Sequence, residues 1–361
     1  MRVAILYRDA LRPGGYPRDV RLLSSSMASC GVEVVLLADE GAETEGLTDR
    51  VQCRRLADFR SAAGRSDLVH IFGLLIPSHV LALRGLHSGP PLVISTLAQL
   101  MPHGMRKSRL KKELYLAAIA RWLRKAIFHA FGPVEEQSVL RRFAGHSTFQ
   151  ASLGVFPAAR PSHVEPGRRP DQRLRLLFLG RNDFRQKGLD ILLRGFRLAV
   201  EGGAEASLSI AGRPWRDSRE RLNGFVRRFR LEERVQLLGE VPEDGKRKLY
   251  AEADYLVFLS RWDGPPRPVR EAIAAGLPVI VSPETNLGHL VEQYGAGIQV
   301  PLESEQVAGV FRELASRPRG DARYAEGVLK LREALRWDEV AATYLAAYHR
   351  IIDGARRAAS T

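Results

Sequence analysis

Short apolar runs alternate with helical patterns along most of the chain. Runs of four to six apolar residues have the length of strands, and the intervening segments repeat their apolar residues with helical spacing. This alternation is typical of βαβ units and parallel sheets. In the first half the pattern predicts a helix over Val20–Ser29, which Cys30-Gly31 ends. It also predicts four strands: Val3–Tyr7, Val32–Leu37, Leu68–Phe72 and Leu92–Ser95.

The pattern restarts after residues 157–173, a segment rich in proline and polar residues that we interpret as a linker. Two doubly wound α/β domains are therefore expected, with a cleft between facing strand ends. The second half predicts a helix over Leu189–Val200 and five strands: Leu174–Leu179, Leu208–Ala211, Val235–Leu238, Tyr255–Leu259 and Pro278–Val281.

Two longer amphipathic helices are also expected. Between Lys107 and Ala130 apolar residues recur at Leu116, Ile119, Leu123 and Ile127, and residues 337–352 form a second amphipathic pattern followed by a frayed tail.

Composition and apolar patterning argue against a membrane-spanning or secreted protein. The chain has 361 residues and no apolar stretch long enough to cross a bilayer, and its first apolar run resembles a strand more than a secretory signal. Its two cysteines, Cys30 and Cys53, offer no disulfide framework and no metal-ligand spacing. A cytoplasmic protein is expected.

The net charge of +14 is concentrated in one segment. Between His103 and Gly145 ten Lys and Arg residues face three acids, which is half of the excess. Such a segment is drawn to anionic lipid, nucleic acid or nucleotides, although it is also typical of a solvated helix face. Nucleic acid fits least, because aromatic side chains at stacking positions are missing. We therefore expect residues 103–145 to associate with an anionic membrane, at its inner face.

Two glycine-containing loops follow predicted strands. In residues 12–21, Gly14-Gly15 precedes a helix, so its amides are placed to meet an anion, although a plain turn has the same pattern. In residues 180–188, Gly180 and Gly188 flank Arg181 and Lys187. Two cations on one loop suit a diphosphate; the alternative is a solvated basic loop.

A third loop carries two carboxylates. Asp263 and Glu271 lie eight positions apart, between one predicted strand and the next. Carboxylates accept hydrogen bonds from adjacent sugar hydroxyls, and Glu271 is expected in the first turn of a helix, where negative charge is favoured. The alternative is that Asp263 serves a turn and Glu271 pairs with Arg267 or Arg270.

These motifs resemble the retaining GT-B glycosyltransferases of family 4, also called glycosyl transferases group 1. The resemblance covers Leu174 to about Pro301 through the GR-x5-KG loop, "IAG", "VQLLGEVP", "LYAEADYLVFLS" and "EAIAAGLPVIVS". It is looser in the first half. It implies two Rossmann-like domains facing across a cleft, over 1–160 and 172–336, and a C-terminal helix over 337–353 that crosses back to the first domain.

The resemblance also assigns roles. Arg181 and Lys187 correspond to the residues that neutralise the donor diphosphate, Glu271 to the one that grips the ribose, and Asp263 to the one facing the donor sugar, in a D-x7-E variant of the family's E-x7-E motif. Gly14 and Gly15 would close on the phosphates, Gly180 belongs to the phosphate loop, and Glu240-Val241 would lie near the base.

Two departures from the family pattern change the details. Prolines 265, 266 and 268 leave only the amides of Gly264, Arg267 and Val269 to touch the donor, and we expect Arg267 to point into the cleft instead. On the acceptor side, where a His followed by an acid is common in the family, Ala98 and Gln99 stand, and His103 is the nearest candidate.

The function implied is retaining transfer of a sugar from a nucleoside diphosphate sugar to an acceptor hydroxyl in polysaccharide, glycolipid or glycoconjugate synthesis. No cofactor or divalent metal is implied, because the cations stabilise the leaving diphosphate. A nucleotide-sugar epimerase of the same fold, or a catalytically silent nucleotide-sugar-binding protein, stays an alternative. The base, sugar and acceptor are left open.

Overall fold

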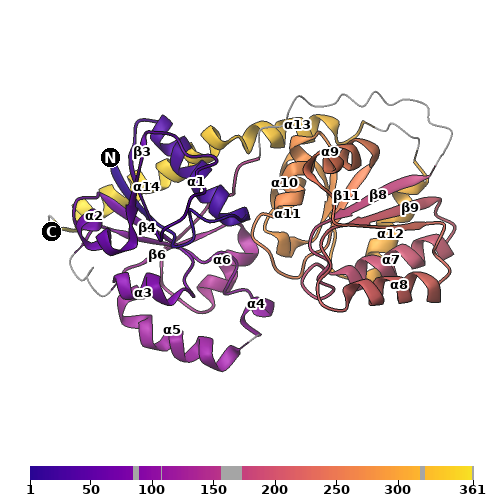
Figure 1. Cartoon of the computed structure of the whole chain (residues 1–361), viewed down its shortest axis with the longest axis horizontal. Helices are drawn as coiled ribbons and strands as arrows, with labels where there is room; N and C mark the ends of the chain where they lie inside the picture. Colours follow the sequence, from indigo (N-terminus) through magenta and orange to yellow (C-terminus); the bar gives the residue numbers. More distant parts are fainter. Residues whose placement is uncertain (84–88, 107, 156–172, 318–321, 360–361) are drawn as a thin grey trace. The chain divides into compact units, whose positions relative to one another are not determined.

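The computed structural model describes residues 1–83, 89–106, 108–155, 173–317 and 322–359 (Figure 1). Most of the predicted linker over 157–173 therefore lies outside the described residues. The chain divides into two compact units, which we call unit 1 and unit 2. Unit 1 contains Met1–Gly154 together with Leu335–Thr361, and unit 2 is Val155–Ala334.

Unit 1 is built on a parallel sheet whose described strands are ordered β3-β2-β1-β4-β5-β6-β7. The central strands are buried on both faces, which is why they appear in the sequence as continuous apolar runs. The strands are β1 (Arg2–Leu6), β2 (Glu33–Ala38), β3 (Val51–Arg55), β4 (Leu68–Phe72), β5 (Leu92–Ser95), β6 (Ile127–Ala130) and β7 (Thr148–Gln150).

The helices of unit 1 cover this sheet and come from both ends of the chain (Figure 1). They are α1 (Gly15–Ser29), α2 (Phe59–Gly64), α3 (Pro77–Leu83), α4 (Pro102–Arg106), α5 (Arg109–Leu123), α6 (Pro133–Leu140) and α14 (Trp337–Ala359), with a 3-10 turn η1 (Leu56–Asp58). The predicted helix over Val20–Ser29 thus begins earlier, at Gly15.

Unit 2 repeats the architecture with a parallel sheet ordered β10-β9-β8-β11-β12-β13 over its described residues. The strands are β8 (Leu174–Leu179), β9 (Ala206–Ala211), β10 (Val235–Gly239), β11 (Tyr255–Phe258), β12 (Val279–Val281) and β13 (Gly297–Gln299). The helices are α7 (Leu189–Glu201), α8 (Ser218–Arg228), α9 (Glu243–Glu252), α10 (Arg267–Ala274), α11 (Gly288–Tyr294), α12 (Ser304–Ala315) and α13 (Ala325–Ala334), with a 3-10 turn η2 (Pro283–Thr285).

In both sheets the strand order reverses beside the first strand of the unit. β1 pairs with β2 on one side and β4 on the other, and β8 pairs with β9 and β11. The loops after β8 and β11 therefore leave the same edge of the sheet side by side, at the switch point where doubly wound folds bind ligands.

The long helix predicted over 107–130 is wrong in its second part. The helix ends at Leu123, and Ile127–Ala130 is strand β6, which lies between β5 and β7. Ile127 continues the helical spacing of Leu123 by coincidence. Phe128 and Ala130 on one face of the strand and His129 on the other are all buried, as expected of a strand covered on both faces.

The C-terminal helix is longer than predicted. α14 continues to Ala359, so the expected fraying after residue 352 is wrong for the described part of the tail. The helix packs against α1 in unit 1 and buries Tyr344 and Tyr348 completely. Gly154 lies against the Trp337 ring, since a Cβ there would be 2.5 Å from Cδ2.

A buried polar chain connects α14 to the sheet of unit 1. His70 lies 2.5 Å from the Tyr348 hydroxyl and 2.7 Å from Ser95 Oγ, which is 2.7 Å from His129 Nδ1. His129 Nε2 is 2.8 Å from the carbonyl of Ala151. Because that carbonyl only accepts, Nε2 carries the proton of His129, and the donors then follow in one direction back to Tyr348. Burial lowers the pKa of both His70 and His129, which keeps both rings neutral.

Candidate functional site

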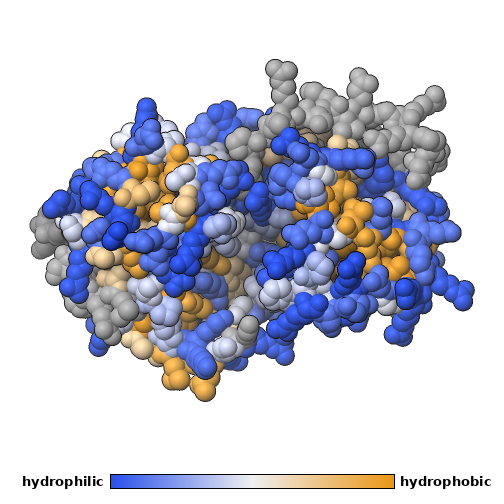
Figure 2. Space-filling model, viewed as in Figure 1, coloured by the Kyte–Doolittle hydropathy of each residue, from blue (hydrophilic) through white to orange (hydrophobic). Residues whose placement is uncertain are grey.

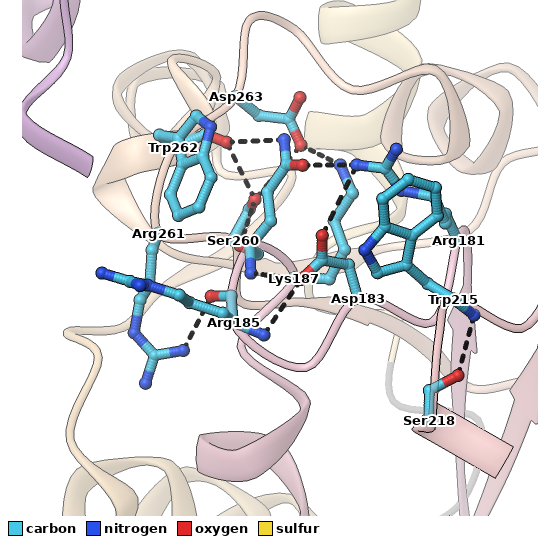
Figure 3. Close-up of polar contacts among 11 residues, drawn as sticks. Arg181, Asp183, Arg185, Lys187, Trp215, Ser218, Ser260, Arg261, Trp262 and Asp263 are labelled. Atoms are coloured by element: carbon cyan, nitrogen blue, oxygen red, sulfur yellow. Dashed lines mark hydrogen bonds and ion pairs between the residues drawn. The ribbon is translucent and has the colours of Figure 1, made fainter. Parts of the chain in front are cut away.

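The loops after β8 and β11 bring together most of the side chains in the site (Figure 3). Arg181 and Lys187 come from the first loop and Asp263 from the second, and their side chains converge in the close-up. Lys187 and Asp263 are 76 positions apart in the sequence. Their proximity follows from the pairing of β8 with β11.

Glycine is required where the loop after β8 approaches its neighbours. Gly188 has φ +62°, and a Cβ there would lie 1.9 Å from the carbonyl oxygen of Leu259. Gly212, after β9, has φ +137°, and a Cβ would lie 1.8 Å from the carbonyl oxygen of Gly180. Only glycine tolerates both the left-handed conformation and such contacts. The backbone of this loop is therefore packed against two neighbouring strand ends.

Lys187 forms an ion pair with Asp263. The ammonium group contacts Asp263 Oδ2, and the two side chains are only 12% and 16% exposed. Ser260 Oγ donates to the same carboxylate oxygen at 3.1 Å, and the Lys187 ammonium lies 5.0 Å from the centre of the Phe258 ring. Asp263 is thus the counter-ion of Lys187 within unit 2.

Arg181 is held by a different set of partners (Figure 3). Its guanidinium donates to Gln186 Oε1 at 2.6 Å, lies 3.6 Å from Asp183 and stacks over the Trp215 ring at 4.4 Å. Arg181 is 40% exposed and Trp215 is 41% exposed. Sequence reasoning missed Trp215, although an aromatic residue three positions after "IAG", in the loop that follows a strand, was a usable signal.

A second pair joins the two loops and was also missed. The Arg261 guanidinium makes two 2.8 Å hydrogen bonds to the Asp190 carboxylate and one of 2.8 Å to the carbonyl of Arg185. Bidentate pairs of this kind fix orientation as well as distance. Arg261 therefore holds the loop after β11 against the start of α7.

Glu271 lies one turn deeper in α10 than predicted. The helix begins at Arg267 with Pro266 at its N-cap, and no acid lies in its first turn. The prolines, which do not disturb the first turn of a helix, start α10 early and leave Glu271 in its second turn. The predicted first-turn position is wrong for this reason.

Glu271 is fully engaged within unit 2. Its Oε1 accepts from Arg267 Nε at 2.6 Å, and its Oε2 accepts from the Tyr250 hydroxyl at 2.9 Å. Burial, with the nearby Glu271 charge, raises the pKa of Tyr250 well above its ordinary value, so this phenol stays a donor. The structure shows the alternative in which Glu271 pairs with Arg267. The Arg267 guanidinium is directed at this carboxylate.

The remaining predicted donor residues lie in both units. In unit 1, Gly14 is the N-cap of α1 with φ +150°, and Gly15 begins the helix. The buried Arg21 holds the preceding loop by donating to the carbonyls of Ala10, at 2.6 Å, and Arg12, at 3.2 Å.

In unit 2 the predicted base and amide contacts lie at helix starts. Val241 is half-buried between β10 and α9. Gly264 is buried just before α10, and the amides of Arg267 and Val269 lie in the first turn of that helix, where backbone N–H groups lack intrahelical partners.

The acceptor-side segment in unit 1 forms a strained turn. Leu97 and Ala98 have φ values of 53° and 58°, and the fully buried Glu135 binds this turn by accepting from the amide of Ala98 at 2.6 Å and from Thr96. Gln99 accepts from the amide of Leu75. His103 lies half-buried in α4. Ala98 and Gln99 stand at the positions where the family pattern has a His followed by an acid.

Two kinds of feature are absent from the described residues. These residues contain no group of three or more His, Cys, Asp or Glu side chains arranged to hold a metal ion. No helix among them has both the length and the apolar character needed to cross a membrane.

Comparison with known sequences finds similarity in the second unit. Residues 173–317 match the family model described as glycosyl transferases group 1. An uncharacterised glycosyltransferase of Methanocaldococcus jannaschii, MJ1607, is 34% identical over 147 residues, which are 40% of this chain and 37% of that protein.

Comparison with solved structures covers nearly the whole chain. Sucrose-phosphate synthase from Thermosynechococcus elongatus has a TM-score of 0.71 at 17% identity over 98% of this chain and 99% of that one. HepE from Anabaena, in complex with UDP and glucose, has a TM-score of 0.67 at 16% identity, over 97% and 100%. At these identities the likeness shows the fold, which is GT-B and confirms the predicted fold class.

Proposed function

Because the chain has the GT-B fold and residues 173–317 match the glycosyl transferases group 1 family, we propose that it is a glycosyltransferase. It transfers a sugar from a nucleoside diphosphate sugar to an acceptor hydroxyl with retention of the anomeric configuration, in the cytoplasm. It needs neither a cofactor nor a divalent metal. The acceptor is a polysaccharide, a glycolipid or another glycoconjugate.

The observation that carries the proposal is the pair of cations at the carboxyl end of β8. Arg181 is 40% exposed and presents a planar fork, while Lys187 presents a compact charge beside it on the same loop. When the sugar leaves, negative charge grows on the diphosphate. Fixed cations placed where that charge develops stabilise the transition state, and each such group contributes roughly 100-fold or more to the rate.

Donor binding is proposed to exchange the partners of the charged residues. The diphosphate replaces Asp263 as the counter-ion of Lys187, and the released Asp263 carboxylate accepts from a hydroxyl of the donor sugar. Glu271, now bound to Arg267 and Tyr250, turns to the ribose hydroxyls in the same way. The structural relative HepE was solved with UDP and glucose, so UDP-glucose is the first donor to test.

The test is a turnover assay with a panel of nucleoside diphosphate sugars, with and without acceptors. We expect one donor to be consumed in the presence of an acceptor, and Lys187→Ala to lower kcat by about 100-fold or more. The matched control is Lys248→Ala, since Lys248 is exposed on α9 and pairs only weakly with Glu252, at 3.9 Å. Proton NMR of the product gives its anomeric configuration.

Three results contradict the proposal in different ways. A sugar product formed without acceptor identifies an epimerase. Tight donor binding without any product identifies a silent binding protein. Near-normal turnover by Lys187→Ala would show that Lys187 is not part of the catalytic site.

A further inference from the structure

Helix α5 in unit 1 has one face that is packed in the core. Leu116, Ile119 and Leu123 are at most 3% exposed and belong to the hydrophobic cluster beneath β5 and β6. Their spacing of three and four residues places them on a single face of the helix. This inner face accounts for the apolar periodicity of the segment.

The opposite face of α5 also carries large apolar side chains. Leu110 is 72% exposed and Leu114 is 64% exposed, which makes them the most exposed large hydrophobic residues in the described part of the chain. They lie four positions apart and so are neighbours on the helix surface. Figure 2 shows hydrophobic side chains gathered at the edge of unit 1 where Figure 1 draws α5.

Exposed cations surround these two leucines. The same outer face carries Lys111 and Arg121, and Arg106, Arg109, Arg124 and Lys125 are exposed at or near the two ends of the helix. The acid of the helix, Glu113, is engaged by Arg142 and lies 3.9 Å from Arg109. Near the leucines, the outer face therefore combines apolar side chains with a local excess of positive charge.

We propose that α5 docks unit 1 on an anionic lipid surface, with Leu110 and Leu114 inserted among the headgroups and the flanking Lys and Arg residues at the phosphates. A helix that lies in the interface needs this combination of an apolar strip and a basic border. Charge alone suggested only a loose attraction of 103–145 to such a surface. The exposed leucines give the contact a defined face and a defined depth.

The positive charge of this face favours an anionic lipid surface over a second copy of the chain as its partner. Two outer faces of α5 brought together would place Lys111 and Arg121 against the same cations of the other copy, which is repulsive. A protein partner with an acidic groove is the remaining occupant, and it would leave the protein unbound to either kind of vesicle.

The test is co-sedimentation of the full-length protein with vesicles of phosphatidylcholine alone or mixed with phosphatidylglycerol. We expect binding only to the mixed vesicles. The double variant Leu110→Ser/Leu114→Ser should raise the lipid concentration needed for half-binding by at least about tenfold, because two leucines lose their apolar burial. Lys111→Glu/Arg121→Glu should raise it similarly and weaken its salt dependence, since Arg106, Arg109, Arg124 and Lys125 remain.

The matched controls lie on α13 in unit 2. Leu329 is 47% exposed and Lys330 is adjacent, so Leu329→Ser and Lys330→Glu make the same chemical changes away from α5. They should leave the half-binding concentration unchanged.

Three results would overturn the proposal. One is binding to mixed vesicles that the serine double variant leaves intact, which would mean charge attraction without insertion. Another is no binding to either vesicle, which would assign the face to a protein partner. The third is a lipid-free dimer that the serine double variant dissociates, which would assign the face to self-association.

Discussion

At the residue scale the central feature is that Lys187 and Asp263 neutralise each other. Both side chains are largely buried, and a buried charge without a partner is strongly destabilising. Each of the two buried charges is therefore compensated by the other. The pairing also places Asp263 in competition with any diphosphate for the same ammonium group.

This competition predicts the behaviour of Asp263→Asn. Removing the carboxylate frees Lys187, so inorganic diphosphate should bind about tenfold more tightly by isothermal titration calorimetry, equivalent to about 1.4 kcal/mol. Turnover should fall, because the neutral amide oxygen of Asn is a weaker acceptor than the carboxylate for the donor-sugar hydroxyl. The matched control is Asp254→Asn, which breaks the 2.7 Å pair with Arg175 at the amino end of β11. Unchanged diphosphate affinity in Asp263→Asn would show that the diphosphate binds elsewhere.

At the element scale α14 depends on two buried neutral histidines. Burial lowers the pKa of His129 to about 4 and lowers the pKa of His70 well below its ordinary value. The unfolded chain then binds more protons than the folded one as pH falls below about 6.5. Stability supplied by these groups is complete above that pH and is lost towards pH 4. Buried Glu135 has a raised pKa and acts in the opposite direction.

The pH dependence is isolated by comparing the protein with His129→Gln. The difference between their unfolding free energies should shrink by about 2 kcal/mol between pH 7 and pH 4.5, because the contribution of Glu135 cancels in the difference. Urea unfolding at the two pH values measures it. His349→Gln, at an exposed position on α14, should show no such change. A difference that stays constant with pH would mean that His129 is not neutral and buried.

At the scale of the whole molecule, each unit completes its own sheet, but unit 1 needs both ends of the chain. α14 follows the whole of unit 2 in the sequence and still contributes Tyr344 and Tyr348 to the interior of unit 1. The Trp337 ring packs against the backbone of Gly154. The chain thus begins in unit 1, passes through unit 2 and returns to unit 1, although each unit has its own sheet.

Ending the chain at Ala334 should therefore damage unit 1 selectively. Loss of α14 uncovers apolar surface and leaves His70 and His129 without their tyrosine partners, which costs several kcal/mol. Hydrogen exchange read by mass spectrometry should show lost protection in β4, β5 and β6 and retained protection in β8 and β11. Equal loss in both units, or none, would contradict this division of the fold.

The sequence by itself determined the elements whose signals are local. The continuous apolar runs Leu68–Phe72, Leu92–Ser95 and Leu174–Leu179 are strands with the predicted ends, because a strand buried on both faces needs no polar alternation. Gly180 and Gly188 are visible in the sequence as flanks of the loop after β8, but the close approach of Gly188 to the carbonyl of Leu259 is a tertiary contact.

Only the tertiary structure decided which distant residues meet. Ile127–Ala130 is a strand because it lies between β5 and β7, although its spacing suited a helix. Lys187 pairs with Asp263, and Trp215 stacks on Arg181, because the strand order places the ends of β9, β8 and β11 next to one another. Periodicity and turn chemistry act over a few residues, whereas strand order is set by the packing of the whole sheet.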